Sequence, residues 1–403
     1  MARAGQLPTP NSQLPNKAGV LEVGGWKLGV SVECIEDSWG FTALRPRWNE
    51  LLRASASDNP FLTWEWLHTW WVHLRGASTL HLIVVRSGDE LIAIAPLRVV
   101  TSPLSFLSRL EFLGTGDAGS DYLDLIVRRG REVEGVQAIA SHLKSRGMAL
   151  RFNHLPPTSL AAQLAARLVE GSGWTSATAD DGTCPVIPLG GQTWDSLLAT
   201  LGSSHRANIR RRVKAIGQQF EMRFDAVTTD GERRQMLADL AVFHDRRYAD
   251  RGGSSAFSDP AVRAFQEELT RRALDRGWLR MYVLRLNGET AAVMYGFNYG
   301  GTFYFYQHGF DDRYKAQSVG LVLMALSVRA ALGEGAREFD MLWGTEPYKA
   351  LWARSARVLQ RADLFPGHRG GAMHRHAVEA RRGVSDLARR VLSLGSPGVS
   401  RAT

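Results

Sequence analysis

The feature that most constrains how this chain can fold is an order of predicted elements that occurs twice, with the copies about 200 residues apart. Each copy opens with a β-hairpin, whose turn is Ser87-Gly88-Asp89 in the first copy and Asn287-Gly288 in the second. A strand, a helix and a last strand follow. The predicted elements are residues 80–86, 90–100, 123–127, 133–144 and 148–152, and then 279–285, 290–299, 304–310, 319–332 and 337–342. A duplicated α/β domain explains this repetition, and 403 residues suit two domains of common size.

The duplication divides the chain into four predicted parts. Residues 1–25 are rich in Pro, Gly, Asn and Gln and are expected to form a disordered leader. Residues 26–189 form the first domain, and residues 190–365 form the second. Residues 366–403 form a basic tail in which apolar side chains at helical spacing predict an amphipathic helix around residues 384–394.

Two further helices are predicted from side-chain periodicity. The first lies between residues 59 and 76, and its predicted core face excludes Trp66 and Trp70. That face consists of Trp64, Leu67, Trp71 and Leu74. The second spans residues 203–218 and is basic, with Arg206 and Arg210 on one face. These two arginines could meet the phosphates of a cofactor, tRNA or an anionic glycan, or they could form a solvated face.

Composition limits the partners and the compartment. A net charge of +9 and a pI near 9.8 favour an anionic partner, which could be nucleic acid, a membrane surface or a phosphate-rich cofactor. No stretch approaches the roughly 20 apolar residues of a spanning helix, and the start lacks a secretory signal, so the expected compartment is the cytoplasm. Cys34 and Cys184 have no Cys/His cluster near them in the sequence, so no disulfide and no metal site are expected.

An anion site is predicted where the helix at residues 319–332 begins. Gln317, Ser318 and Gly320 lie at this N-terminus, where backbone N–H groups and the helix dipole favour a phosphate. The alternative is that Ser318 only caps the helix and Gly320 only permits close packing.

The densest group of chemically useful residues follows the last predicted strand. Asp340 and Glu346 are candidate bases for acyl transfer, Tyr348 is a candidate acid, and Lys349 is a candidate partner for a phosphate or an oxyanion. His308 is a secondary candidate base on the strand before. Backbone N–H groups at residues 307–309 could form an oxyanion site if that strand carries a bulge.

The alternative for these residues is structural. In it, Asp340 and Lys349 form an ion pair at the strand end, and Tyr348 and Trp352 belong to the core. Under the catalytic interpretation, Asp340 and Lys349 are exposed cleft groups, so Asp340→Asn and Lys349→Ala should reduce turnover with little loss of stability.

The run Phe339-Asp340-Met341-Leu342-Trp343-Gly344, followed by Glu346, Tyr348 and Lys349, resembles the CelD-like acetyltransferases associated with cellulose biosynthesis, which are related to the FemAB-type aminoacyl and peptidyl transferases. The resemblance covers about residues 30–360. It implies two tandem GNAT-like domains, each with a mixed, mainly antiparallel sheet flanked by helices. Gln317 and Gly320 match the family's phosphate loop, whereas Val319 and Val322 depart from it.

The same resemblance implies an acyltransferase that uses acetyl-CoA or another acyl-CoA. The acceptor would be an amine or a hydroxyl on a small molecule or a glycan, such as a precursor of a surface polysaccharide. The first domain, without an equivalent of Glu346 to Lys349, would shape the acceptor cleft, and the protein could associate with an anionic membrane or a polysaccharide synthesis complex. The alternatives are a FemAB-like transferase that depends on aminoacyl-tRNA and a non-catalytic scaffold of such a complex.

Overall fold

The computed structural model describes residues 20–23, 26–101, 107–248 and 255–380. The elements of the first half are β1 (Val20–Val23), β2 (Trp26–Ile35), α1 (Ser38–Ala43), α2 (Arg45–Arg53), η1 (Pro60–Leu62), α3 (Trp64–Leu74), β3 (Thr79–Ser87), β4 (Glu90–Thr101), β5 (Ser108–Phe112), β6 (Ile126–Val127), α4 (Glu132–Arg146), β7 (Ala149–Leu155), α5 (Leu160–Val169) and β8 (Thr175–Pro188).

The second half repeats the same alternation of helices and strands. Its elements are α6 (Trp194–Thr200), α7 (Ser203–Gln219), β9 (Met222–Ala226), α8 (Asp230–Tyr248), α9 (Ser255–Ser258), α10 (Pro260–Asp275), β10 (Leu279–Leu286), β11 (Glu289–Tyr299), β12 (Thr302–Phe310), η3 (Asp312–Gln317), α11 (Val319–Gly333), β13 (Glu338–Asp340), α12 (Pro347–Trp352) and β14 (Ser355–Phe365).

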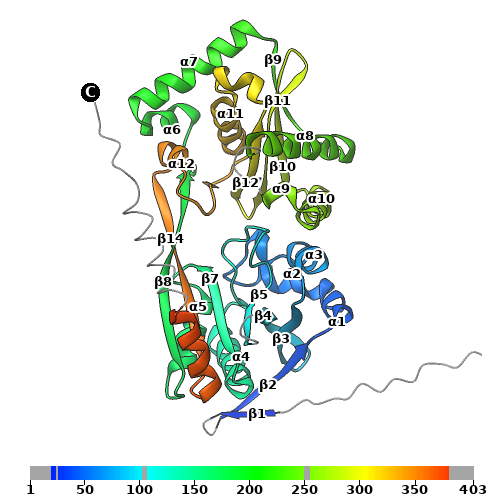
Figure 1. The fold of residues 1–403 in the computed structure, drawn as a ribbon, viewed down its shortest axis with the longest axis vertical. Coiled ribbons are helices and arrows are strands. Elements are labelled where there is room, and N and C mark those ends of the chain that lie inside the picture. Colours follow the sequence, from blue (N-terminus) through cyan, green and yellow to red (C-terminus); the bar gives the residue numbers. More distant parts are fainter. Residues whose placement is uncertain (1–19, 24–25, 102–106, 249–254, 381–403) are drawn as a thin grey trace, which may run out of the picture.

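One mixed sheet connects the two halves. Its strand order is β1-β2-β3-β4-β5-β7-β14-β8-β13-β12-β11-β10-β9, and β6 pairs with β4 beside this path. The pairs β5–β7 and β12–β13 are parallel, and the other neighbours are antiparallel. Figure 1 shows two lobes joined along one side by the long strands β8 and β14. The α/β class with a mixed, mainly antiparallel sheet is as predicted.

The duplication is visible in the strand pairing. In the first half, β3 and β4 form a hairpin, β5 follows, and α4 leads into β7, which is parallel to β5. In the second half, β10, β11, β12, α11 and β13 repeat this order, including the parallel pair. Both predicted hairpins and both predicted helices, at residues 133–144 and 319–332, are confirmed.

One predicted strand is wrong. Residues 123–127 were expected to supply the third strand of the first half, but β5 at Ser108–Phe112 does so, and only Ile126 and Val127 pair, as β6. The reason is Asp124, whose carboxylate accepts hydrogen bonds from the N–H groups of Leu160 (3.0 Å) and Ala161 (2.7 Å) at the start of α5. This contact caps a distant helix and holds the preceding residues in a loop.

The ends of the chain depart partly from the predicted division. Val20–Val23 form β1, so this part of the expected leader is a strand, and the rest of residues 1–25 lies outside the described residues. Residues 369–380 are helical, whereas the predicted amphipathic helix at 384–394 lies outside the described residues. β14, which was assigned to the second domain, pairs with both β7 and β8 and so ties the two halves together.

The junction between the halves is aromatic. Trp66 and Trp70 were expected to lie off the core face of α3, but both are buried. α3 packs against α10 of the second half, as Figure 1 shows. The Trp66 ring makes edge contacts with Phe265, Phe297 and Tyr306, at centroid distances of 5.4 to 5.7 Å. A helix buried on two sides needs apolar residues beyond a single stripe, which explains the extra tryptophans.

Candidate active site

The candidate active site lies where two parallel strands separate. β12 and β13 pair only from Thr302↔Glu338 to Tyr304↔Asp340. β13 then ends, and the chain turns away through Leu342 (φ 57°) and Gly344 (φ 135°) while β12 continues. A cavity of about 270 Å³ occupies this separation. It is lined by Asp117, Ala118, Gly119, Asp121, His154, His244, Phe305, Tyr306, Gln307, His308, Met341, Leu342, Trp343, Glu346, Tyr348 and Lys349.

β12 carries a bulge at the wall of this cavity, which is the condition stated for the oxyanion site. Tyr295 pairs with Gln307 and Gly296 pairs with Phe305, so Tyr306 is the extra residue. Gly296 is needed here because a Cβ atom would lie 2.2 Å from the carbonyl oxygen of Tyr304. The Tyr306 hydroxyl donates a hydrogen bond to the carbonyl of Ala118, so the bulge also connects β12 to the first half.

Asp340 does not line the 270 Å³ cavity, and its carboxylate is instead hydrogen-bonded within the protein. One carboxylate oxygen accepts hydrogen bonds from the Tyr122 hydroxyl (2.8 Å) and from Nη1 of Arg357 (2.6 Å), and the other accepts from the N–H of Leu342 (2.8 Å). Burial raises the pKa of Asp340 to about 6, and its three hydrogen-bond donors oppose this rise. The residue joins β13, β14 and the first half.

Lys349 is also buried, and it lines the 270 Å³ cavity, where its catalytic role stays a prediction. Its Nζ lies 2.9 Å from the carbonyl oxygen of Trp343, 3.3 Å from that of Leu342 and 3.1 Å from Oε2 of Glu346. These contacts hold the turn with positive φ after β13. The expected Asp340–Lys349 ion pair is therefore wrong in its partners: Asp340 pairs with Arg357, and Lys349 pairs with Glu346. The description of Asp340 and Lys349 as exposed cleft groups is wrong as well.

The other predicted catalytic residues come together at the 270 Å³ cavity. Glu346, Tyr348 and His308 all line it, and the rings of His308 and Tyr348 lie 5.8 Å apart. The backbone carbonyl of His308 lies 3.0 Å from Nε2 of His244. Their catalytic roles stay a prediction.

A carboxylate–imidazole pair from the first half was missed at the sequence level. His154 Nδ1 lies 3.1 Å from Oδ1 of the buried Asp121, and the other oxygen of Asp121 accepts a hydrogen bond from the N–H of Trp343 (2.8 Å). The His154 ring stacks on Trp343 with centroids 5.3 Å apart. Asp181 accepts a hydrogen bond from the N–H of His154 (2.7 Å) and lies 3.7 Å from its Nε2.

The electrostatics of this pair suit a proton acceptor. Burial lowers the pKa of His154, but the hydrogen bond to Asp121 and the charges of Asp121 and Asp181 outweigh burial, so the pKa is raised above its usual 6.5. With Nδ1–H directed at Asp121, Nε2 is the nitrogen that can take up a proton. In the sequence, the only signal was that His154 directly follows Asn153. Asn153 takes the place of Asp340 when residues 150–153 of the first copy are aligned with residues 337–340 of the second.

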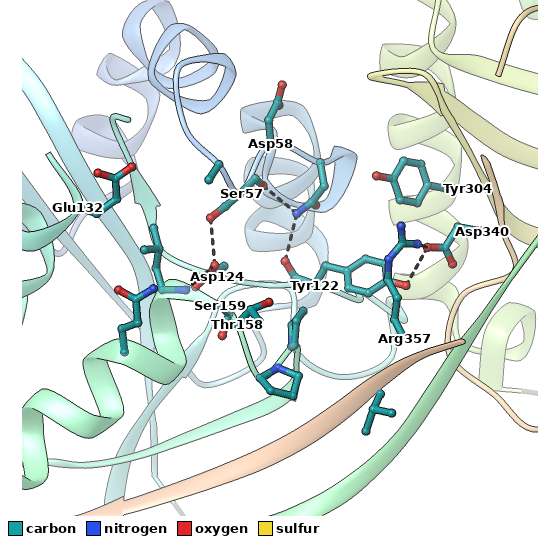
Figure 2. A pocket seen from close by; sticks show the side chains of 17 residues that line it. Ser57, Asp58, Tyr122, Asp124, Glu132, Thr158, Ser159, Tyr304, Asp340 and Arg357 are labelled. Carbon is teal, nitrogen blue, oxygen red and sulfur yellow. Dashed lines mark hydrogen bonds and ion pairs between the residues drawn. The ribbon is translucent and has the colours of Figure 1, made fainter. Parts of the chain in front are cut away.

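A larger cavity of about 690 Å³, with Asp340 in its wall, is lined by residues of both halves (Figure 2). Ser57, Asp58, Asp124 and Thr158 line it from the first half, and Tyr304, Asp340 and Arg357 line it from the second. Its polar wall is ordered: the hydroxyl of Ser57 donates to Asp124 (3.0 Å), and Arg357 pairs with both Asp340 and Glu338. Asp340 and Tyr122 thus line this cavity, whereas their chain neighbours Met341 and Asp121 line the smaller one.

Comparison with known families finds one matching family, and the match lies in the second half. Residues 203–350 match the family described as the acetyltransferase (GNAT) domain. The second half is therefore similar to a GNAT-type acyltransferase domain over these residues, which make up less than half of the chain. Comparison with curated proteins finds no match. The similarity to the CelD-like family in particular stays a prediction.

Solved structures share the fold over most of the chain. The crystal structure of FemX has a TM-score of 0.57 at 10% identity, covering 79% of this chain and 95% of that one. The C-terminal domain of a protein described as a lysylphosphatidylglycerol synthetase from Agrobacterium fabrum has a TM-score of 0.51 at 10% identity, covering 82% and 93%. L-PGS from Bacillus licheniformis has a TM-score of 0.50 at 12% identity, covering 80% and 92%. At these identities the likeness shows the fold alone.

The predicted phosphate loop lies at the N-terminus of α11 in the GNAT domain. Ser318 adopts φ 58° and makes no side-chain cap, so the capping role suggested for it is wrong. Oε1 of Gln317 is buried and has no hydrogen-bond partner, and as an acceptor it does not itself favour a phosphate. Val319 and Val322, which depart from the family pattern, are fully buried, so packing accounts for them.

The two arginines predicted to bind phosphate differ in their partners and in their exposure. The guanidinium of Arg206 donates to the carbonyls of Leu198 (3.4 Å) and Ala199 (3.2 Å) and thereby fixes the turn between α6 and α7. Arg210 is exposed, with Asp195 at 3.8 Å, and keeps most of its donors in solvent. The α11 N-terminus with Gln317 is therefore the better candidate for a phosphate than Arg206.

Proposed function

We propose that this protein transfers an acyl group from an acyl-CoA to an amine or a hydroxyl of a small molecule or glycan. The observation that carries the proposal is the 270 Å³ cavity between β12 and β13 of the GNAT domain, into which the first half contributes the Asp121–His154 pair. A nucleophile in this cavity has a proton acceptor beside it, which acyl transfer requires.

The proposed chemistry uses residues from both halves. A bound acyl-CoA supplies a thioester, whose carbonyl carbon the acceptor attacks. Nε2 of His154 takes the proton from the attacking nitrogen or oxygen, and Asp121 holds the ring and stabilises the imidazolium. The Tyr348 hydroxyl gives a proton to the departing sulfur, and backbone N–H groups beside the bulge at Tyr306 stabilise the oxyanion.

The proposed site for the cofactor's phosphates is the N-terminus of α11, with Gln317, Ser318 and Gly320. This position supports the proposal because the helix dipole and the backbone N–H groups of the first turn favour an anion. Lys349 holds the turn that forms one wall of the cavity, and Glu346 orients this lysine.

Replacement of Gly320 tests the cofactor site. A glutamate at position 320 brings a negative charge to the phosphates, so we expect it to weaken acetyl-CoA binding at least about tenfold, or about 1.4 kcal/mol. Gly320→Ala is the matched control, because both variants place a Cβ atom 3.3 Å from the Phe310 ring. Calorimetric titration measures both. Equal loss in the two variants, or no binding by the folded wild type, contradicts the proposed site.

The proposed acceptor site is the 690 Å³ cavity, because Tyr304 and Asp340 in its wall directly precede Phe305 and Met341 in the wall of the catalytic cavity. It also carries carboxylates and hydroxyls that can bind a sugar. We expect Thr158→Trp, at an exposed position in its wall, to raise the acceptor KM about tenfold or more and to leave acetyl-CoA affinity unchanged. Thr158→Ser is the control. A change in acetyl-CoA affinity without a change in acceptor KM would argue that this cavity serves another purpose.

A second candidate donor is aminoacyl-tRNA. The fold shared with FemX and with a protein described as a lysylphosphatidylglycerol synthetase, together with the net charge of +9, favours it. Retention of labelled aminoacyl-tRNA on filters, falling steeply with salt, would support this donor over acyl-CoA. The scaffold alternative predicts that neither donor binds.

The proposed location is the cytoplasm, with peripheral contact to an anionic membrane or a polysaccharide synthesis complex. The positive charge supports such contact. Within the described residues, the helices are too short or too polar to span a bilayer.

A further inference from the structure

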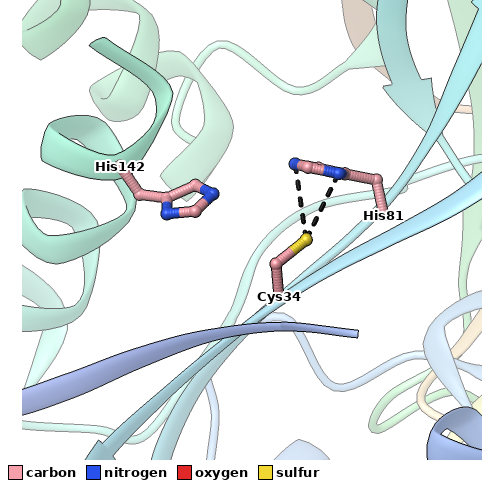
Figure 3. Close-up of side chains that lie close together, drawn as sticks. All are labelled: Cys34, His81 and His142. Atoms are coloured by element: carbon pink, nitrogen blue, oxygen red, sulfur yellow. Dashed lines mark hydrogen bonds between the residues drawn. The ribbon is translucent and has the colours of Figure 1, made fainter. Parts of the chain in front are cut away.

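A cluster of metal-ligand side chains lies in the first half, away from both cavities. Cys34 on β2, His81 on β3 and His142 on α4 point toward one another (Figure 3). Sγ of Cys34 lies 3.2 Å from Nδ1 of His81, and one ligand atom from each residue lies within 4.8 Å of the others. The sequence shows no Cys/His cluster near Cys34, because residues 47 and 61 positions apart in the sequence meet only in the fold.

One ring nitrogen of this cluster has no hydrogen-bond partner in the protein. This nitrogen is Nε2 of His142, and it is buried. An unsatisfied polar group at a helix–sheet contact is costly, and apolar side chains would fill the space at no such cost.

Glu36 provides a fourth possible ligand atom, a carboxylate oxygen, at the edge of the cluster. Its Oε1 lies 3.4 Å from Nδ1 of His81, 3.7 Å from Sγ of Cys34 and 3.1 Å from Nη2 of Arg146. The Glu36 side chain is 56% exposed, so an ion can enter from solvent on this side. We propose that Cys34, His81, His142 and Glu36 bind a zinc ion.

The donor set favours zinc. Thiolate, imidazole and carboxylate are its usual ligands in tetrahedral sites. One thiolate, one carboxylate and two neutral imidazoles around Zn²⁺ give a site of zero net charge, which suits a half-buried position. Zinc–ligand bonds of about 2.1 to 2.3 Å require ligand atoms about 3.5 Å apart, so the farthest pair among Cys34, His81 and His142 must approach by roughly 1 Å.

The expected role of the ion is structural. It would link β2, β3 and α4, and none of the four ligands lines the 270 Å³ or the 690 Å³ cavity. Bound metal stabilises the folded state by mass action, so zinc should raise the melting temperature of the full chain, and a chelator should reverse the rise.

The test is titration of chelator-treated full-length protein with Zn²⁺, and separately with Co²⁺. We expect one ion per chain, and thiolate-to-cobalt charge-transfer absorption with tetrahedral d–d bands. Cys34→Ser should weaken zinc affinity at least about 100-fold and abolish the charge-transfer band, and His142→Ala should weaken binding about as much. Cys184→Ser, which removes the other thiol, should retain both binding and the band.

Arg146 gives an independent test that does not remove a ligand. Because Arg146 competes with the ion for Glu36, Arg146→Gln should tighten zinc binding several-fold, whereas Glu36→Gln should weaken it. The proposal is overturned if the folded wild type binds no stoichiometric zinc, or if Cys34→Ser binds zinc as the wild type does.

Discussion

Replacement of His154 by asparagine is expected to lower kcat about 100- to 10,000-fold, the usual contribution of a positioned base. Asparagine suits the site because His154 has φ 52°, a conformation that asparagine adopts more readily than most residues. The variant should therefore fold and bind acetyl-CoA normally. Steady-state kinetics with circular dichroism measure both effects, and His376→Asn, on an exposed part of the terminal helix, is the control.

The pH dependence of the same reaction distinguishes a base from a structural histidine. The raised pKa of His154 means that the base form appears as pH rises through a value above 6.5. In the wild type, kcat/KM should rise with pH across that value, and in His154→Asn the rise should be absent. A variant with normal kcat, or one that keeps the rise, contradicts the assigned role.

Replacement of Asp340 by asparagine is expected to lower the free energy of unfolding by about 2–4 kcal/mol. The buried carboxylate accepts hydrogen bonds from Tyr122, Arg357 and the N–H of Leu342, and an amide cannot accept all three. Urea denaturation measures the loss. Tyr122 belongs to the first half and Asp340 to the second, so the loss should appear in the unfolding of both halves.

Glu338→Gln is the matched control for Asp340→Asn. Glu338 pairs with the same arginine, Arg357, but is 36% exposed, so this change should cost about 1 kcal/mol or less. If the two variants lose equal stability, the buried junction is not what holds the halves together. If Asp340→Asn loses activity at unchanged stability, Asp340 acts in the chemistry as the sequence motif suggested.

The sequence predicted those parts of the fold that depend on local patterns. The hairpin turn Asn287-Gly288 and the apolar stretch of α11 determine their elements from neighbouring residues alone. The repeated order then predicted two similar halves. β5 was missed because residues 123–127 have a stronger strand pattern, and only the contact of Asp124 with α5 shows why most of them form a loop.

The candidate site was predicted only for the half that carries a compact motif. Glu346, Tyr348 and Lys349 lie within four residues of one another, so one motif identified them. Asp121 and His154 are 33 residues apart and meet Trp343 because β7, β14, β8 and β13 pair side by side in the sheet, which no local pattern encodes. Trp66 is similar, because its burial depends on α10 of the other half. Contacts between the halves were therefore the part that sequence reasoning could not reach.

Hydrogen–deuterium exchange of the full chain with and without acetyl-CoA tests the central claim most directly. We predict that acetyl-CoA slows exchange in residues 305–322 and 341–349, which form the bulge, the α11 N-terminus and the turn after β13. The peptide that contains His154 should be protected as well, because it shares the cavity. Protection confined to other parts of the chain, or none at saturating acetyl-CoA, would contradict an acyl-CoA site between β12 and β13.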